Sequence, residues 1–183
     1  MLFCFLILLV SCGDSSQPNG EKPAADKPSN IIKQAHIYRS SNANVNIEIF
    51  APLVINYPGD SSKMEFPKGV KAVFFNKDMT TKSVLTADYA VNLRPSNDYI
   101  LRQNVKIVNY NTEDTIYCQD LIWQSETQQI YTQKPIKRIS RTGTDYGEGL
   151  KANEAMDSVI IIKPHGTQIV EEEEEVSTPT TKV

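Results

Sequence analysis

The sequence is poor in the residues on which most active sites and disulfide frameworks depend. Its 183 residues include three cysteines and two histidines, and it has no HExxH, CxxC or GxSxG motif and no phosphate-cradling glycine loop. Two of the cysteines lie within the first twelve residues, which leaves Cys118 alone in the rest of the chain. One thiol cannot form an internal disulfide, so we interpret Cys118 as a small buried apolar residue.

The histidines, His36 and His165, are far apart in the sequence. We interpret His165, which stands between Pro and Gly, as a turn residue. No carboxylates stand at a catalytic or metal-ligating spacing, so we predict no enzyme activity, metal site or cofactor. An enzyme would need a pocket assembled from scattered polar residues such as Asp88, Asp120 and His165, and we keep that as a third hypothesis.

The chain also lacks an excess of positive charge. Its formal net charge is −3, and residues 35–170 contain 15 Lys and Arg against 14 Asp and Glu. Nucleic-acid binding requires a clustered basic surface, so the composition argues against a nucleic-acid partner.

The N-terminal apolar run is too short to cross a bilayer. Residues 1–11 are apolar except Ser11, whereas a membrane-spanning helix needs roughly 20 apolar residues. The run fits a secretory signal, and Leu9-Val10-Ser11 before Cys12 follows the pattern of a bacterial lipobox. We predict a lipoprotein signal peptide over 1–11 and a lipid anchor on Cys12. Two or more acyl chains on this cysteine would hold the protein stably at a membrane. The alternative is a buried N-terminal helix or strand.

Two polar segments flank the central domain. Residues 12–34 follow the cysteine with no periodic apolar pattern and are predicted to form a flexible tether. Residues 171–183 read EEEEEVSTPTTKV, a charge block followed by Ser, Thr and Pro, which is typical of an acidic disordered tail. The remaining residues 35–170 are sufficient for one domain with a real core.

Short alternating runs of apolar and polar residues indicate that this domain is all-β. They are separated by the turn signals YPGDSS, RPSNDY, NYNTED and RTGTDYG, and such spacing is typical of a sandwich or open barrel. The runs occupy residues 44–50, 71–76, 104–110, 128–133, 136–140 and 157–163.

A weak internal repeat suggests how the strands are arranged. LTADYAVNL (85–93) aligns with IYCQDLIWQ (116–124), so that Asp88 matches Asp120, and a partial third copy carries Gly149 at that position. The repeat is about 30 residues long and supplies two strands per unit. Units of this kind stack along one axis, which leaves an open edge at each end of the stack.

The two-residue period also predicts two faces. Val105 and Ile107 point to one side and Lys106 and Val108 to the other, while Ile116 shares a face with Cys118. If the sheet curls on itself, the first face lines an apolar interior. Periodicity alone leaves two alternatives open, a lipid-holding groove and a filled sandwich core.

The second half of the domain carries a recognisable rhythm. Residues 104–152 contain a V-x-I strand, a short turn, an acidic residue before Leu-x-Trp, a strand ending at a basic cluster, and then G-x-G-L. Together with an anchored N-terminus and a tether, this pattern resembles the LptC family, the periplasmic component of the lipopolysaccharide export machinery. The resemblance covers residues 35–170.

The resemblance implies an open β-jellyroll, folded like a taco, built from repeated two-strand units. Its apolar interior would hold the acyl chains of lipopolysaccharide. The residues expected to line that interior are Val105, Ile107, Ile116, Leu121, Trp123 and Ile130. Four basic residues could contact the lipid's phosphates at a rim, although solvated strand ends explain them equally well: Lys134, Lys137, Arg138 and Arg141.

The resemblance also implies partners and a location. The protein would sit in the periplasm, held at the inner membrane by Cys12, between an inner-membrane Lpt ABC transporter and an LptA-like bridge jellyroll. Each partner would join an edge strand by strand addition. The expected N-terminal edge lies in residues 43–57 and the C-terminal edge in 157–163, and the residues expected to dock are Val45, Ile47, Ile49, Val159, Ile160 and Ile161.

Two further interpretations remain. A soluble bridge or outer-membrane member of the same machinery would share the fold, but the lipobox and single short domain favour the anchored component. A lipoprotein with a filled β-sandwich, acting as a structural or glycan-binding module, would have a dry packed interior and surface aromatics.

Overall fold

The computed structural model describes residues 27–59 and 62–168. The predicted signal peptide, Cys12 and the acidic tail lie outside the described residues. The described part consists of antiparallel strands and turns without a helix, which confirms the all-β prediction. In chain order the strands are β1 Asn30–Ser41, β2 Asn44–Tyr57, β3 Lys63–Phe66, β4 Val70–Phe75, β5 Thr81–Ala87, β6 Tyr89–Leu93, β7 Asp98–Asn109, β8 Asp114–Gln124, β9 Gln129–Thr132, β10 Ile136–Ser140, β11 Gly143–Gly147, β12 Gly149–Asn153, β13 Val159–Ile162 and β14 His165–Gln168.

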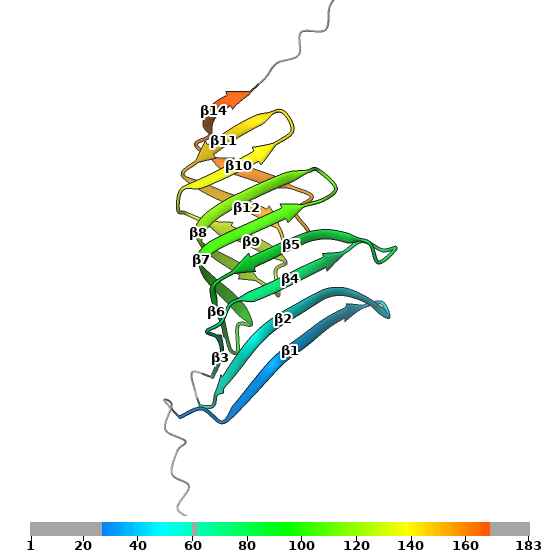
Figure 1. Ribbon diagram of the computed structural model, residues 1–183, viewed down its shortest axis with the longest axis vertical. Coiled ribbons are helices and arrows are strands. Elements are labelled where there is room, and N and C mark those ends of the chain that lie inside the picture. The colour runs from blue at the N-terminus through cyan, green and yellow to red at the C-terminus, as the bar shows by residue number, and fades with distance from the viewer. Residues whose placement is uncertain (1–26, 60–61, 169–183) are drawn as a thin grey trace, which may run out of the picture.

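The strands stack along the long axis of the molecule, from β1 at one end to β14 at the other (Figure 1). They belong to one continuous sheet that folds over on itself without closing. We call the two halves the front and back layers, as Figure 1 presents them. The front layer contains β4, β5, β10, β11 and β14, the back layer contains β3, β6, β9, β12 and β13, and β1, β2, β7 and β8 run through both. This arrangement is the open, folded sheet that the family resemblance implies.

The layers meet along one side of the molecule, which we call the crease. Along this side the chain passes from one layer to the other at Gly69, Asp88 and Glu148, and within β7 at a bulge formed by Gln103 and Asn104. Both bulge residues have positive φ, and a bulge of this kind bends a strand sharply. The backbone N–H of Asp88 donates to the carbonyl of Gln103, at 3.0 Å. These adjacent bends fold the sheet along a single line.

The internal repeat corresponds to this crease. Its aligned positions are Asp88 between β5 and β6, Asp120 within β8, and Gly149 at the start of β12. All three copies therefore cross from the front layer to the back layer at the same point of the repeat. The glycine is needed there because a Cβ on residue 149 would lie 2.7 Å from the carbonyl oxygen of Thr132.

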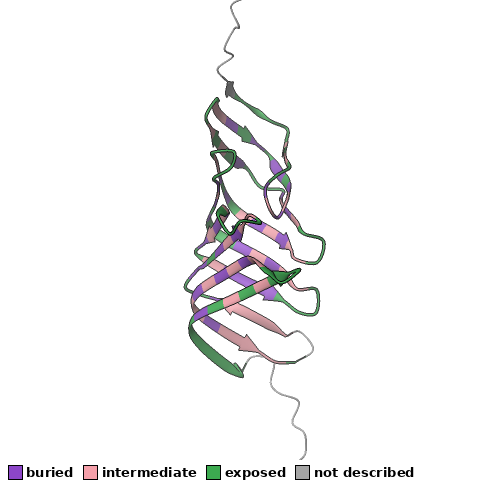
Figure 2. Ribbon diagram, turned by 90° about the vertical axis from the view of Figure 1, so that its right-hand side faces the viewer, coloured by how far each residue is buried: buried purple, intermediate pink, exposed green. Residues whose placement is uncertain are grey.

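Strand pairing aligns the inward-facing residues of the front layer into one apolar row. Six residues from β1, β2, β4, β5, β7 and β8 are successive cross-strand partners: Ile37, Ile49, Ala72, Leu85, Ile107 and Ile116. Along β4 and β5, and in the second half of β7, buried residues alternate with half-buried or exposed ones, as the colours in Figure 2 show. The core therefore lies between the two layers and extends along the stack.

The N-terminal edge differs from the prediction. The strand containing Val45, Ile47 and Ile49 is β2, which pairs with β1 on one side and with β3 and β4 on the other. The edge strand is instead β1, whose first residues, 30–34, fall in the range assigned to the tether. Only Ala35 of β1 is buried, so this strand lacks the alternating apolar signal that identifies the others.

The C-terminal end of the stack has two edge strands. Among the described residues, β13 pairs only with β12, and β14 pairs only with β11. The segment RTGTDYG, predicted to be a turn, is a turn only at residues 141–142, because Gly143–Gly147 form β11. That strand is held by β10 on one side and β14 on the other. Pairing on both sides overrides the low strand propensity of Gly and Asp.

Candidate functional site

The interior between the layers is the candidate site. All six residues predicted to line it point inward from β7, β8 and β9, and each has at most 2% of its surface exposed. Val105 and Ile107 lie on one face of β7, while Lys106 and Val108 lie on the other, as the alternation predicts. The pattern in β8 changes parity at the crease, where exposed Gln119 and half-buried Asp120 separate Cys118 from Leu121. The six residues therefore share one apolar space, and their role in lipid binding stays a prediction.

Aromatic side chains fill the middle of this space. The Trp123 ring stacks on Tyr99, with centroids 4.8 Å apart, and meets Phe74 edge-on at 5.5 Å. Phe66 continues the cluster at 6.1 Å from Tyr99. These residues come from both layers, so the cluster joins the layers through apolar contact. Sequence reasoning identified Trp123 but missed Phe66, Phe74 and Tyr99, of which only Phe74 stands in a predicted alternating run.

Near the C-terminal end of the stack, the apolar row is followed by two charged residues. Its next two cross-strand positions, after Ile116, are Arg138 on β10 and Asp145 on β11. The Arg138 guanidinium donates from Nε to the Asp145 carboxylate at 2.9 Å, and Asp145 is 6% exposed. Arg138 therefore faces the interior with a carboxylate partner, rather than standing free at a rim.

The other basic residues proposed for the rim do not gather with it. Lys137 points to the outer face of β10, Lys134 lies in the β9–β10 connection, and Arg141 lies in the β10–β11 turn. The structure therefore places these four side chains in different surroundings and forms no single basic cluster from them.

The interior is closely packed between β7, β8 and the segment that joins β12 to β13. A gap bounded by Ile107, Ile116, Met156 and Val159 encloses about 180 Å³ and has no room for a water-sized sphere. An occupant of several acyl chains would therefore need the layers to separate.

The side opposite the crease, which we call the open side, is bridged by residues 154–158, the strap. The strap connects β12 to β13 in the back layer, yet its contacts reach the front layer. Asp157 accepts a 2.7 Å hydrogen bond from Lys82 on β5, and the carbonyl of Met156 accepts one of 2.9 Å from the Asn109 amide on β7. Met156 itself is 2% exposed and belongs to the core.

Glu154 anchors the strap at its other end. Its carboxylate pairs with Arg39 from β1 and accepts a 3.0 Å hydrogen bond from the indole N–H of Trp123. Arg39 also donates to the hydroxyl of Ser125 at 3.4 Å. The glutamate is 7% exposed, and a buried carboxylate is tolerated only with such partners. Sequence reasoning missed the strap because no local pattern marks its partners, which lie up to 115 positions away.

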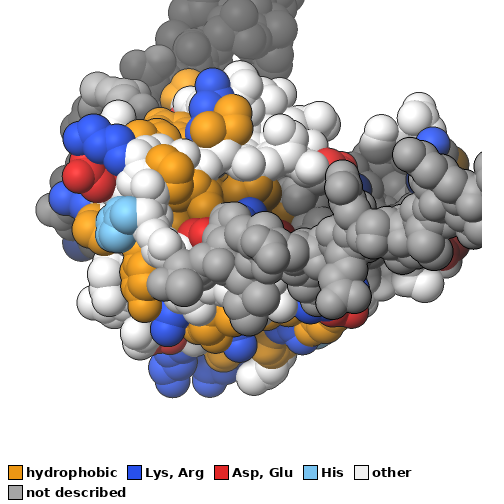
Figure 3. All heavy atoms as spheres, turned by 90° about the horizontal axis from the view of Figure 1, so that it is seen from above, with side chains coloured by type: hydrophobic (Ala, Val, Ile, Leu, Met, Phe, Trp, Pro, Cys, Tyr) orange, Lys and Arg blue, Asp and Glu red, His pale blue; other side chains and the backbone are white. Residues whose placement is uncertain are grey.

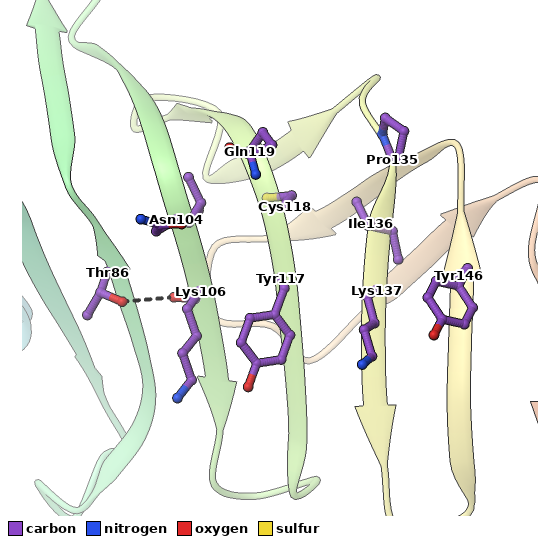
Figure 4. A pocket seen from close by; sticks show the side chains of 11 residues that line it. Thr86, Asn104, Lys106, Tyr117, Cys118, Gln119, Pro135, Ile136, Lys137 and Tyr146 are labelled. Atoms are coloured by element: carbon purple, nitrogen blue, oxygen red, sulfur yellow. Dashed lines mark hydrogen bonds between the residues drawn. The ribbon is translucent and has the colours of Figure 1, made fainter.

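A larger hollow lies on the outer face of the front layer. It measures about 590 Å³, and Figure 4 shows Lys106, Tyr117, Lys137 and Tyr146 side by side across four neighbouring strands. The Lys106 ammonium lies 5.8 Å from the centre of the Tyr117 ring. This surface is open and partly cationic, so it is unsuited to acyl chains, which require an apolar enclosure.

The remaining candidates for chemistry have separate, structural environments. Asp88 accepts a 2.6 Å hydrogen bond from Asn104, Asp120 is the cross-strand partner of Arg102, and His165 begins β14, where its ring stacks on Tyr146 at 5.8 Å. His165 is thus a strand residue rather than the predicted turn residue. Within residues 27–59 and 62–168, no three His, Cys, Asp or Glu side chains stand together as metal ligands.

Cys118 is buried beside the crease, as predicted. Burial, reinforced by the neighbouring Asp120 carboxylate, raises the pKa of the Cys118 thiol to about 12. The thiol is therefore neutral at physiological pH, and reactivity of a cysteine follows its thiolate fraction.

The edge strands at the C-terminal end present apolar surface. Val159 and Ile161 pack against the core, whereas Ile160 is 59% exposed and Ile162 is 41% exposed. Figure 3 looks onto this end and shows hydrophobic side chains among basic and polar ones. None of the described segments is a helix with the length and apolar character needed to cross a membrane.

The comparison with known families decides the assignment. A family model described as lipopolysaccharide assembly, LptC-related, matches residues 1–165. The chain belongs to this family. LptC-related proteins are non-enzymatic transport components of the cell envelope, so this chain acts in lipopolysaccharide assembly, with lipopolysaccharide and the export machinery as its partners in general terms. No curated protein matches the sequence.

Proposed function

We propose that the interior of the folded sheet receives the acyl chains of lipopolysaccharide from an inner-membrane ABC transporter and passes them to a periplasmic bridge jellyroll. The observation that carries this proposal is the apolar row from Ile37 to Ile116, which crosses six adjacent strands. A row perpendicular to the strands offers a lipid a continuous path along the stack. Neighbouring strands lie about 4.8 Å apart, so the row is about 24 Å long.

The energetics agree with a carrier that holds lipid reversibly. Burial of apolar surface contributes about 25 cal/mol per Å², so several acyl chains would bind strongly. The packed layers must separate before lipid can enter, and the free-energy cost of that separation offsets part of the gain. Release then requires a neighbouring protein with a similar apolar path, and this chain needs no nucleotide site of its own.

The two ends of the stack are the docking surfaces in this proposal. At the N-terminal end the transporter pairs with β1 rather than with Val45, Ile47 and Ile49 of β2. At the C-terminal end the bridge pairs with β13, which contains Val159, Ile160 and Ile161. Unpaired edge strands bind partners through backbone hydrogen bonds, which require no particular side chain.

The location completes the proposal. Lipid on Cys12 holds the protein at the periplasmic face of the inner membrane, and residues between the anchor and β1 act as the tether. The Cys12→Ala variant tests this part: it should lose acyl labelling and membrane attachment. The lipobox assignment would be overturned if the variant remains fully membrane-bound and the wild-type protein carries no acyl label.

Photocrosslinking tests the carrier function. A photoreactive amino acid at Ile107 or Trp123 should yield a lipopolysaccharide adduct in intact cells, whereas the same group at outward-facing Lys106 of the same sheet should not. Absence of adducts from both interior sites, in a folded and membrane-bound protein, would favour the alternative of a lipoprotein with a filled core. The tight packing of the gap beneath Met156 is the observation that supports this alternative.

A further inference from the structure

The strap has the chemical character of the ligand proposed for the interior. Its central residue, Met156, places a flexible apolar side chain in the core, where it is 2% exposed. Glu154 and Asp157 flank it on either side and carry carboxylates. An apolar group between anionic groups is also what an acidic lipid presents to a groove: chains that need burial and a headgroup that needs cations.

The partners of the strap fit the same description. Asp157 pairs with Lys82, and Glu154 pairs with Arg39. Both cations belong to strands of the front layer and lie on the open side, where the layers part. A lipid with its chains in the interior would have its headgroup at this opening.

The strap is held both by contacts with its surroundings and by hydrogen bonds within its own turn. Met156 has a φ of 61°, which is uncommon for a residue other than glycine and persists only where the environment enforces it. The Asn153 side chain accepts hydrogen bonds from the backbone of Asp157 at 2.8 Å and of Ser158 at 3.3 Å. These bonds lie within the turn and involve no residue of the front layer.

We propose that the strap is an internal substitute for an anionic lipid, and that Arg39 and Lys82 form the headgroup site that it masks. In the empty protein Met156 occupies the place of an acyl chain, and Glu154 and Asp157 occupy the places of anionic headgroup groups. Lipid entry displaces the strap and takes over both cations. This inference rests on the proposed carrier function and adds a defined contact for the headgroup.

The exchange is electrostatically reasonable because neither cation would be left without a partner. The Lys82 side chain is 17% exposed and that of Arg39 is 31% exposed. Removing one member of a partly buried ion pair is costly, whereas replacing it with another anion conserves the interaction. Phosphate and carboxylate groups both satisfy Arg and Lys, so a phosphorylated headgroup is a suitable replacement.

Binding of lipopolysaccharide to the purified full-length protein in detergent tests the exchange. Asp157→Asn weakens the strap and leaves Lys82 in place. Because the Asp157 side chain is 55% exposed, its ion pair contributes modestly, and we expect apparent affinity to rise about threefold as a larger fraction of molecules opens. Lys82→Gln breaks the same strap contact but also removes the cation proposed to bind the headgroup, so this variant should bind more weakly than Asp157→Asn. An Asp157→Asn variant that binds no more tightly than wild type, or a Lys82→Gln variant that binds as tightly as Asp157→Asn, would overturn the proposal.

Charge exchange provides a matched control. In the Lys82→Glu/Asp157→Lys double variant the strap contact is restored with reversed polarity, but the front layer now presents an acid to the headgroup. We expect near-native stability and weaker binding of phosphorylated lipopolysaccharide, with binding of a dephosphorylated form unchanged. If the double variant binds both lipids more weakly and to the same extent, the substitutions act through the stability of the protein and not through contact with the headgroup phosphates.

The interior crosslink separates this proposal from the carrier function. If a photoreactive group at Ile107, which leaves the strap contacts intact, yields adducts at the same level in wild type, Asp157→Asn and Lys82→Gln, lipid enters the interior without the exchange, so the strap proposal fails and the carrier function stands. If no variant yields an adduct, the carrier function itself fails, and the strap proposal with it.

Discussion

The crease and the open side hold the same two layers together by different means. At the crease the chain itself passes between layers, at Gly69, Asp88 and Glu148, and through continuous β7 and β8. At the open side the layers are joined by side chains, chiefly those of the strap: Asp157 with Lys82, and Glu154 with Arg39. Covalent connection cannot be exchanged for a ligand, whereas ion pairs and hydrogen bonds can.

This difference suggests that the two sides have different roles in lipid entry. A folded sheet that must admit and release a large lipid needs one side that never separates and one that does. Elements that open are drawn from regions with fewer buried contacts. The following predictions test whether the two sides respond to substitution in this way.

The largest effect is expected at the crease, from Gly149→Val. A Cβ at this position would lie 2.7 Å from the carbonyl oxygen of Thr132 and 3.1 Å from the Ile162 side chain. The backbone oxygen belongs to β9, which pairs with β12, so it cannot move away easily. We expect a loss of about 3 kcal/mol in the free energy of unfolding, measured by denaturant titration of the full-length protein followed by circular dichroism.

The neighbouring Glu148→Ala is the control for that experiment. Glu148 lies between Gly147 and Gly149. It forms an ion pair with Lys163 in which both side chains are more than half exposed. Exposed pairs contribute little, so we expect a change within about 0.5 kcal/mol. A similar loss in both variants would mean that any substitution in this turn is damaging, and close packing at Gly149 would not explain its effect.

The crease is also where sequence and structure agree best, because its signals are local. The repeat placed Asp88, Asp120 and Gly149 at equivalent positions, and a period of two residues assigned Val105 and Ile107 to the interior. The strap could not be predicted in this way. Arg39 and Glu154 are separated by 115 positions, and each has the sequence context of a solvated charge. Likewise, β1 carries almost no buried face, so its pairing with β2 is visible only in three dimensions.

Thiol labelling compares the two sides directly. Cys118 lies beside the crease, and burial raises its thiol pKa to about 12. At pH 8 about 10⁻⁴ of such a thiol is ionised, against about a quarter for an ordinary cysteine of pKa near 8.5. We therefore expect native Cys118 to react with iodoacetamide about 10³-fold more slowly than a free cysteine, and faster as the pH rises toward 12.

Met156→Cys, made together with Cys118→Ala, reports on the open side. If the strap separates from the front layer as proposed, the introduced thiol should be labelled faster than Cys118 of the wild type under the same conditions, and Asp157→Asn should accelerate it further. Labelling of the introduced thiol as slow as that of Cys118, and unaffected by Asp157→Asn, would show that the strap is as permanent as the crease. The comparison between the two sides would then no longer hold.

The smallest effect is expected from Trp123→Phe, which removes the indole N–H that donates to Glu154 at 3.0 Å while keeping an aromatic ring against Tyr99 and Phe74. Hydrogen bonds to charged groups contribute about 1.5–3 kcal/mol, but Arg39 continues to satisfy Glu154. We therefore expect a loss of about 1 kcal/mol in the free energy of unfolding.

A double-mutant cycle with Glu154→Ala separates the hydrogen bond from the volume of the ring. If the bond is responsible, Trp123→Phe should be clearly less costly once Glu154 has been removed. An equal cost in both backgrounds would assign the effect to packing alone. In that case the aromatic cluster, rather than the buried carboxylate, would join the layers at this point, and opening would require Trp123 to leave Phe74 of the front layer.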